Sequence, residues 1–186
     1  CPDRPGIVAG VSTLLFQRGC NILDAQQYDD EETGRFFMRV VFDAAETAQV
    51  LSDAFTPLAN DFSMRWSLRP VAEKRRVMIL VSGFHHCLAD LLYRWRMGEL
   101  PMEIAAVVSN HPRETFTDID LSDVPFHHLP IRRDTKLEQE AALWKLIGDT
   151  DTELVVLARY MQVLSDGLAA KLEERCINIQ PSFLPG

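Results

Sequence analysis

The chain has 186 residues and a formal net charge of −8, and 47% of its residues are hydrophobic. This composition is typical of globular protein and supplies enough apolar side chains for one large core or two small ones. No apolar run approaches the ~20 residues that a membrane span needs. The acidic balance disfavours broad nucleic-acid binding, which requires a basic surface. We therefore expect neither a membrane partner nor a nucleic-acid partner.

The cysteines are widely spaced and form no Cys-x-x-Cys pair. This spacing is typical of reduced, structural cysteines, and it predicts a cytoplasmic location together with the lack of an N-terminal signal-peptide pattern. The sequences His85-His86-Cys87 and His127-His128 contain metal-ligand types. Adjacent side chains usually point apart, so we expect no metal site.

The first residues predict a helix start. Apolar residues recur at helical spacing from Ile7 to Leu15, and Gly19 ends the pattern. Asp3 is the expected N-cap of this helix, and Pro5 is an expected early helical residue.

Residues 1–70 predict a small α+β domain. The expected order is helix, strand, strand, helix and strand, with strands at 21–28, 35–42 and 62–68 and the second helix at 47–59. One more strand upstream of Pro2 would complete a ferredoxin-like unit, so we expect that residues before the given chain are missing.

Residues 77–186 predict a doubly wound, mostly parallel α/β sheet, joined to the first domain by a polar linker at 71–76. Short apolar runs alternate with helical patterns. The expected strands are 77–81, 103–108, 124–129, 154–158 and 176–179, and the expected helices are 88–97, 134–147 and 165–172, the last capped by Ser165. Ligands of such sheets bind at the carboxyl ends of the strands.

The segment Asp3-Arg-Pro-Gly-Ile-Val8 resembles the start of the first helix in ACT domains, which sense small molecules. The resemblance implies an amino-acid effector bound at Asp3, Pro5, Gly6, Ile7 and Asn21. A well-capped helix start with no effector explains the same residues.

The segment Cys176–Gly186 resembles the Asn-x-His-Pro-Ser-Leu-Leu-Pro signature of enzymes that handle the formyl group of 10-formyltetrahydrofolate. Together with Gly34-Arg-Phe-Phe-Met-Arg39, His86-Cys-Leu-Ala-Asp-Leu-Leu-Tyr-Arg-Trp-Arg96 and Leu157-Ala-Arg-Tyr-Met-Gln162, it makes nearly the whole chain similar to formyltetrahydrofolate deformylases. The resemblance implies a Rossmann-like formyltransferase domain after a ferredoxin-like ACT domain. It also implies a hydrolase that converts 10-formyltetrahydrofolate into tetrahydrofolate and formate for purine biosynthesis, with folate as substrate and no cofactor.

The same resemblance assigns the catalytic positions. Asn178 is the expected oxyanion donor, and the family's catalytic His falls at Gln180. Glutamine cannot exchange protons near neutral pH, and losing a general acid–base group typically lowers the rate ~10²–10⁴-fold. The family's partner Asp would lie beyond Gly186, so we expect the given chain to be truncated and weak as a catalyst.

Four further residues are expected to contact folate: Arg159, Met161, Gln162 and His111. The resemblance places the first three on the loop that wraps the pterin and glutamate tail in related transferases. Arg159 suits the folate carboxylates, although a surface ion pair explains it equally well. His111 follows the strand expected at 103–108 and faces the same edge.

Three functions remain open at this point. The first is the deformylase, and the second is an inactive homologue that binds folate and an amino acid, which Gln180 favours. The third is a formyltransferase with a nucleotide acceptor. Phe84 and His85 disfavour it, because they fill a turn where a glycine-rich loop would cradle phosphate. We also expect a homo-oligomer, because an exposed edge strand in the first domain must be protected.

Overall fold

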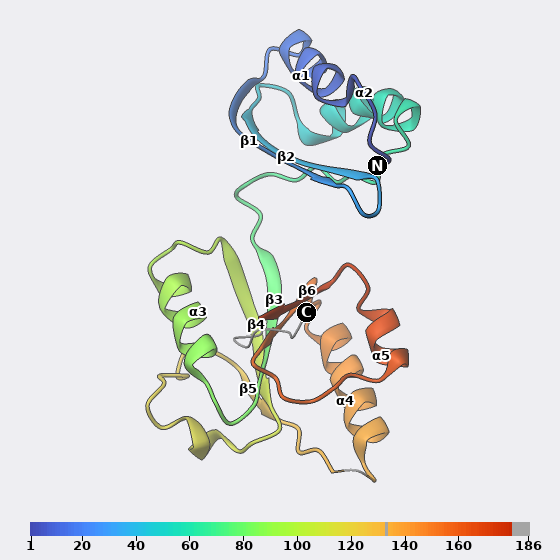
Figure 1. The fold of residues 1–186 in the computed structure, drawn as a ribbon. Coiled ribbons are helices and arrows are strands. Elements are labelled where there is room, and N and C mark those ends of the chain that lie inside the picture. Colours follow the sequence, from blue (N-terminus) through green and yellow to red (C-terminus); the bar gives the residue numbers. More distant parts are fainter. Residues whose placement is uncertain (133, 180–186) are drawn as a thin grey trace. The chain divides into compact units, whose positions relative to one another are not determined.

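The structure is a computed structural model that describes residues 1–132 and 134–179. It divides into two compact units, Cys1–Val71 and Ala72–Gly186 (Figure 1). Among the described residues, no helix combines the length and the apolar character that a membrane crossing requires.

The first unit packs two helices on one side of a β-hairpin (Figure 1). Its elements are α1 (Ile7–Gln17), β1 (Asn21–Asp30), β2 (Arg35–Asp43) and α2 (Ala48–Asp61), and the two strands pair antiparallel. The helical periodicity of α1 buries Ile7, Val11 and Leu15. Gly10 lets the helices approach closely, because a Cβ there would stand 3.0 Å from Leu58 Cδ1.

The start of α1 differs from the prediction. The N-cap is Gly6, whose φ of 99° lies in the left-handed region that glycine adopts readily, and no side chain caps the helix. Asp3 and Pro5 therefore precede the helix, and both assignments were wrong. The backbone N–H of Asp3 donates instead to Gly34 O at 2.9 Å. Gly19 ends the helix as expected, with φ 68°.

The strand expected at 62–68 does not form, so this prediction was wrong. A strand needs a partner ladder, and alternation of apolar and polar residues does not supply one. Along β2, the backbone partners are residues 1–3 on one side, with a bridge between Pro2 and Arg35, and β1 on the other. Trp66 packs edge-on against Phe55 at 4.7 Å between ring centroids, which accounts for the apolar positions of the segment.

The second unit is a five-stranded parallel sheet in the order β5-β4-β3-β6-β7, with helices on both faces (Figure 1). Its elements are β3 (Arg75–Val81), α3 (His86–Arg96), β4 (Met102–Ser109), η1 (Arg113–Phe116), β5 (Phe126–His128), α4 (Lys136–Asp149), β6 (Leu154–Ala158), α5 (Asp166–Lys171) and β7 (Cys176–Ile179). The doubly wound fold class is confirmed. The strand β3 begins inside the segment 71–76 that was expected to be a linker.

Two apolar layers hold this sheet. One face packs Ile79 and Val81 of β3 against Leu88 and Leu92 of α3. The other face packs its own alternate residues, including Met78 and Leu80, against Leu143 of α4 and Leu168 of α5. Because β3 is buried on both faces, its sequence is a continuous apolar run rather than an alternating one. This rigid centre fixes where the strands end.

Candidate functional site

The carboxyl ends of the parallel strands bring several polar loops to one edge of the sheet. The exits that matter here are Ser82–His85 after β3, Asn110 and His111 after β4, Leu129 after β5, and Arg159–Gln162 after β6.

Ser82 joins three of these loops. It is only 3% exposed. Its hydroxyl donates to Asn110 Oδ1 at 2.8 Å and accepts from the backbone N–H of Met161 at 3.0 Å. A buried hydroxyl that uses both its donor and an acceptor site in this way fixes the relative positions of the β3, β4 and β6 exits.

His111 also lies at this edge. Its backbone N–H donates to the buried Ser109 Oγ at 3.0 Å, which holds the turn after β4. The ring lies against Gly83, where a Cβ would stand 3.5 Å from Nε2. The predicted ligand-contact residues His111 and Met161 are thus brought to a common edge through Ser82 and Gly83.

Arg159 is held at both its backbone and its side chain. It has a φ of 55°, and its backbone N–H donates to Ile179 O at 3.3 Å. The guanidinium carbon lies 4.4 Å from the centre of the Phe84 ring. No carboxylate of the described residues pairs with Arg159. Among the described residues, Arg159 thus contacts an aromatic ring and forms no ion pair.

The remaining predicted residues of this edge are placed as follows. Asn178 lies on β7 in register with Leu157 of β6, and Asn178 is exposed. Met161 is 64% exposed and Gln162 is half-buried. Gln180, the position of the family His, lies outside the described residues.

His85 and Asp118 form a contact that the sequence did not indicate. His85 Nε2 lies 2.9 Å from Asp118 Oδ2, and its Nδ1 lies 3.2 Å from Gly83 O. The hydrogen bond with Asp118 is the main cause that raises the pKa of His85, and the same bond lowers the pKa of Asp118. The two contacts of the His85 ring tie the β3–α3 loop to the segment after η1, and in the protonated form both ring nitrogens donate.

The hydrogen bond between His85 and Asp118 makes the stability of the protein depend on pH, because it raises the pKa of His85. A raised His pKa stabilises the fold fully below the unfolded value of about 6.5, and this stabilisation is lost as pH rises through the folded pKa. The Asp118 contribution is present above its unfolded value of about 3.9 and is lost only in acid. We expect His85→Gln to reduce the fall in melting temperature as the pH is raised from about 6 to 8.5.

Thermal denaturation followed by circular dichroism at a series of pH values measures this change. Asp118→Asn is the matched partner variant, and it should reduce the same fall in melting temperature between about pH 6 and 8.5. A slope in His85→Gln equal to that of the unsubstituted protein would show that the contact does not contribute to stability.

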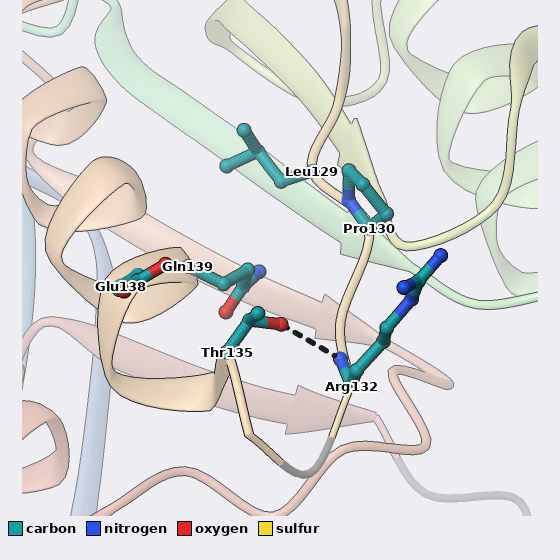
Figure 2. Close-up of a pocket in the computed structure, with 6 residues that line it drawn as sticks. All are labelled: Leu129, Pro130, Arg132, Thr135, Glu138 and Gln139. Carbon is teal, nitrogen blue, oxygen red and sulfur yellow. Dashed lines mark hydrogen bonds between the residues drawn. The ribbon is translucent and has the colours of Figure 1, made fainter.

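A pocket of about 380 Å³ lies between the loop after β5 and the start of α4 (Figure 2). This volume is within the range of small-molecule sites. Its lining residues are Leu129, Pro130, Arg132, Thr135, Glu138 and Gln139. The backbone N–H of Arg132 donates to Thr135 Oγ1 at 3.2 Å, and no carboxylate among the described residues forms an ion pair with the Arg132 guanidinium.

The pocket is joined to the β6 exit by a buried hydrogen bond. Gln139 Nε2 donates to Tyr160 Oη at 3.2 Å, and burial raises the pKa of Tyr160. The adjacent residue of α4, the buried Glu140, accepts from Ser165 N at 2.8 Å and also from the Ser165 hydroxyl. Ser165 in turn caps α5, as predicted, by accepting from Leu168 N at 3.3 Å. These contacts fix both ends of the loop that carries Arg159 and Met161.

The expected effector residues of the first unit do not all come together. Gly6 and Ile7 lie at the start of α1, and Asp3 and Pro5 precede it. Asn21 opens β1 beyond the other end of the same helix. The 11 residues of α1 span about 16 Å. Within the first unit, Asn21 therefore lies about one helix length from the other expected effector residues.

Within the described residues, no group of three or more His, Cys, Asp or Glu side chains is arranged to hold a metal ion.

The two units match separate family models. Residues 75–186 match the formyl transferase model, and residues 1–54 match the ACT domain model. A formyltetrahydrofolate deformylase of Corynebacterium sp. (strain P-1) is 48% identical over 100% of this chain and 65% of its own length. The protein of that name from Bacillus subtilis (strain 168) is 43% identical over 100% of this chain and 63% of its own length.

The solved structures agree with this similarity. The crystal structure of formyltetrahydrofolate deformylase from Burkholderia mallei matches with a TM-score of 0.87 and 46% identity, over 100% of this chain and 66% of that one. The chain thus spans slightly less than two thirds of these relatives. The matched formyl transferase model covers more than half of the chain, and the region that matches the ACT domain model precedes it. The chain therefore belongs to the formyl transferase family and groups with the formyltetrahydrofolate deformylases.

Proposed function

We propose that the protein containing this chain hydrolyses 10-formyltetrahydrofolate to tetrahydrofolate and formate, a cleavage of a linear C–N amide bond. The observation that carries the proposal is the edge of the parallel sheet, where Ser82 joins three exit loops beside an exposed Asn178 and an Arg159 with no described carboxylate partner. The identity to proteins named formyltetrahydrofolate deformylase supports the same reaction.

The reaction needs an oxyanion donor and proton transfer. Water attacks the formyl carbon, the bond between that carbon and N10 breaks, N10 gains a proton, and the formyl carbon leaves as formate. The amide N–H of Asn178 suits the developing oxyanion because it donates a hydrogen bond without carrying a charge that must be neutralised. By resemblance, the proton-transfer position is 180, which Gln180 occupies.

Two arginines suit the negatively charged part of folate. Arg159 lies at the β6 exit and Arg132 lines the pocket beside α4. Both guanidiniums are available for bidentate bonds to carboxylates. Met161 and Gln162 on the same loop, and His111 across Gly83, are proposed to contact the rest of the ligand. In this proposal folate is the substrate, and no further cofactor takes part.

Formate release tests the proposal. The whole protein is mixed with 10-formyltetrahydrofolate, and formate and tetrahydrofolate are both quantified against a no-protein control. Equal amounts of the two products above background are expected. Folate binding without formate release would instead support the alternative, a folate- and amino-acid-binding homologue, which the amide side chain at Gln180 favours.

The first unit is proposed to be a regulatory domain that binds an amino-acid effector at the start of α1. The match to the ACT model supports this role. Self-association through the first unit is part of the proposal: β1 pairs only with β2 among the described strands, and nine of its ten residues are exposed. A cytoplasmic location is proposed from the four free cysteines.

A further inference from the structure

Phe84 is an unusual residue for a loop tip, because its side chain is large, apolar and 65% exposed. It stands between Gly83 and His85 in the turn after β3. Among the described residues, the Arg159 guanidinium is its side-chain partner, with the guanidinium carbon 4.4 Å from the ring centre. Burial in a core therefore does not explain the ring, whereas the cation above it does.

The loop that carries Phe84 is held on both sides. On one side, the buried Ser82 bonds to Asn110 and to the backbone of Met161. On the other, His85 bonds to Gly83 O and to Asp118, and its ring packs edge-on against Phe116 at 5.4 Å. The residues on both sides of Phe84 are thus held in place, which limits how far its backbone can move.

Arg159 is fixed in the same way at its backbone. A non-glycine residue with a φ of 55° is strained and persists only where its surroundings hold it, here through the bond from its N–H to Ile179 O. Stacking on Phe84 uses the flat face of the guanidinium. The in-plane N–H donors are left for a carboxylate, which they match in a bidentate fork.

We propose that Phe84 is a positioning residue, whose ring holds the Arg159 guanidinium in the orientation that binds a glutamate carboxylate of folate. The inference rests on the proposed function and names the residue that prepares its carboxylate site. An arginine held in its binding geometry loses less side-chain entropy when the ligand arrives. A fixed cation also matters because a chain with a net charge of −8 repels a dianionic ligand.

Binding to two ligands separates positioning from general stability. The whole protein is titrated with tetrahydrofolate and with its bis-amide, in which both glutamate carboxylates are neutral amides. We expect Phe84→Leu to weaken tetrahydrofolate binding about 3- to 10-fold and to leave bis-amide binding within about 2-fold. Phe84→Tyr keeps the aromatic face and should restore the affinity. In turnover, Phe84→Leu should raise KM with little change in kcat.

Arg159→Met completes a double-mutant cycle with Phe84→Leu. If Phe84 acts through Arg159, the double variant should bind tetrahydrofolate about as weakly as Arg159→Met alone. Equal weakening of both ligands, no weakening of either, or additive effects in the cycle would each overturn the inference. An unsubstituted protein that binds no tetrahydrofolate would overturn the proposed function itself, and the inference with it. Melting temperatures confirm that each variant is folded.

Discussion

Replacing Gln180 with histidine in the whole protein is expected to raise the rate of formate release by at least about 10²-fold. Glutamine offers an N–H donor and a carbonyl acceptor, but neither group gains or loses a proton near neutral pH. Histidine titrates near pH ~6.5 and can carry a proton between water and N10. Single-turnover formate release measures the chemical step without product release.

The pH dependence gives a second signature of this substitution. A general base must be unprotonated, so kcat/KM of Gln180→His should rise as the pH increases through the pKa of the new imidazole, whereas the unsubstituted protein should lack this step. Gln27→His is the matched control, because it introduces the same side chain on the exposed strand β1. Unchanged turnover in Gln180→His would remove Gln180 as the limit on the rate.

The sequence predicted the second unit better than the first for a physical reason. Residues such as Ile79 and Leu80 of β3 face opposite layers of the same core, so their continuous apolar run has one structural interpretation. The segment 62–68 has an equally clear alternation, but a strand also requires a partner, and alternation does not identify one. Asp3 illustrates the same limit, because the left-handed turn at Gly6 displaced it from the cap.

The candidate site divides along similar lines. Motifs located Arg159, Met161 and Asn178, because each follows or ends a strand whose position the sequence indicates. The contact between His85 and Asp118 joins residues 33 positions apart, and the bond from Gln139 to Tyr160 joins residues 21 apart. Such contacts depend on how two loops meet, which no local pattern encodes. Gln139 and Glu140, two polar residues at helical spacing from Leu143 of α4, were the available signal.

The polar residues at the sheet edge fall into two groups, those that hold loops in place and those whose side chains have no described carboxylate partner. Ser82, His85 and Glu140 hold loops in place through bonds to other residues of the chain. Arg159 and Arg132, by contrast, have no described carboxylate partner. Two cations without a described carboxylate partner, one beside a pocket and one at a strand end, are consistent with the anionic ligand that the proposed function requires. The proposed folate substrate, with its glutamate carboxylates, fits that arrangement.

Asn178 offers the sharpest test of the chemistry, because its proposed bond forms with the oxyanion of the transition state. We expect Asn178→Ala to lower kcat about 10²- to 10³-fold with little change in KM, the loss typical of a single oxyanion donor. Asn178→Asp keeps the shape but replaces the donor with a negative charge, so it should lower kcat at least as far. Asn60→Ala removes an exposed asparagine from α2 and serves as the control.

A loss in Asn178→Ala that appears in KM rather than in kcat would mean that the side chain binds the ground state and is not the oxyanion donor. Retention of kcat within about 3-fold would place the donor elsewhere on the edge, since the loss expected for a single oxyanion donor is far larger. Comparing the variants by tetrahydrofolate affinity separates these cases, because a group that acts only in the transition state contributes nothing to product binding. The proposed mechanism requires that Asn178→Ala keep its affinity for tetrahydrofolate while its kcat falls.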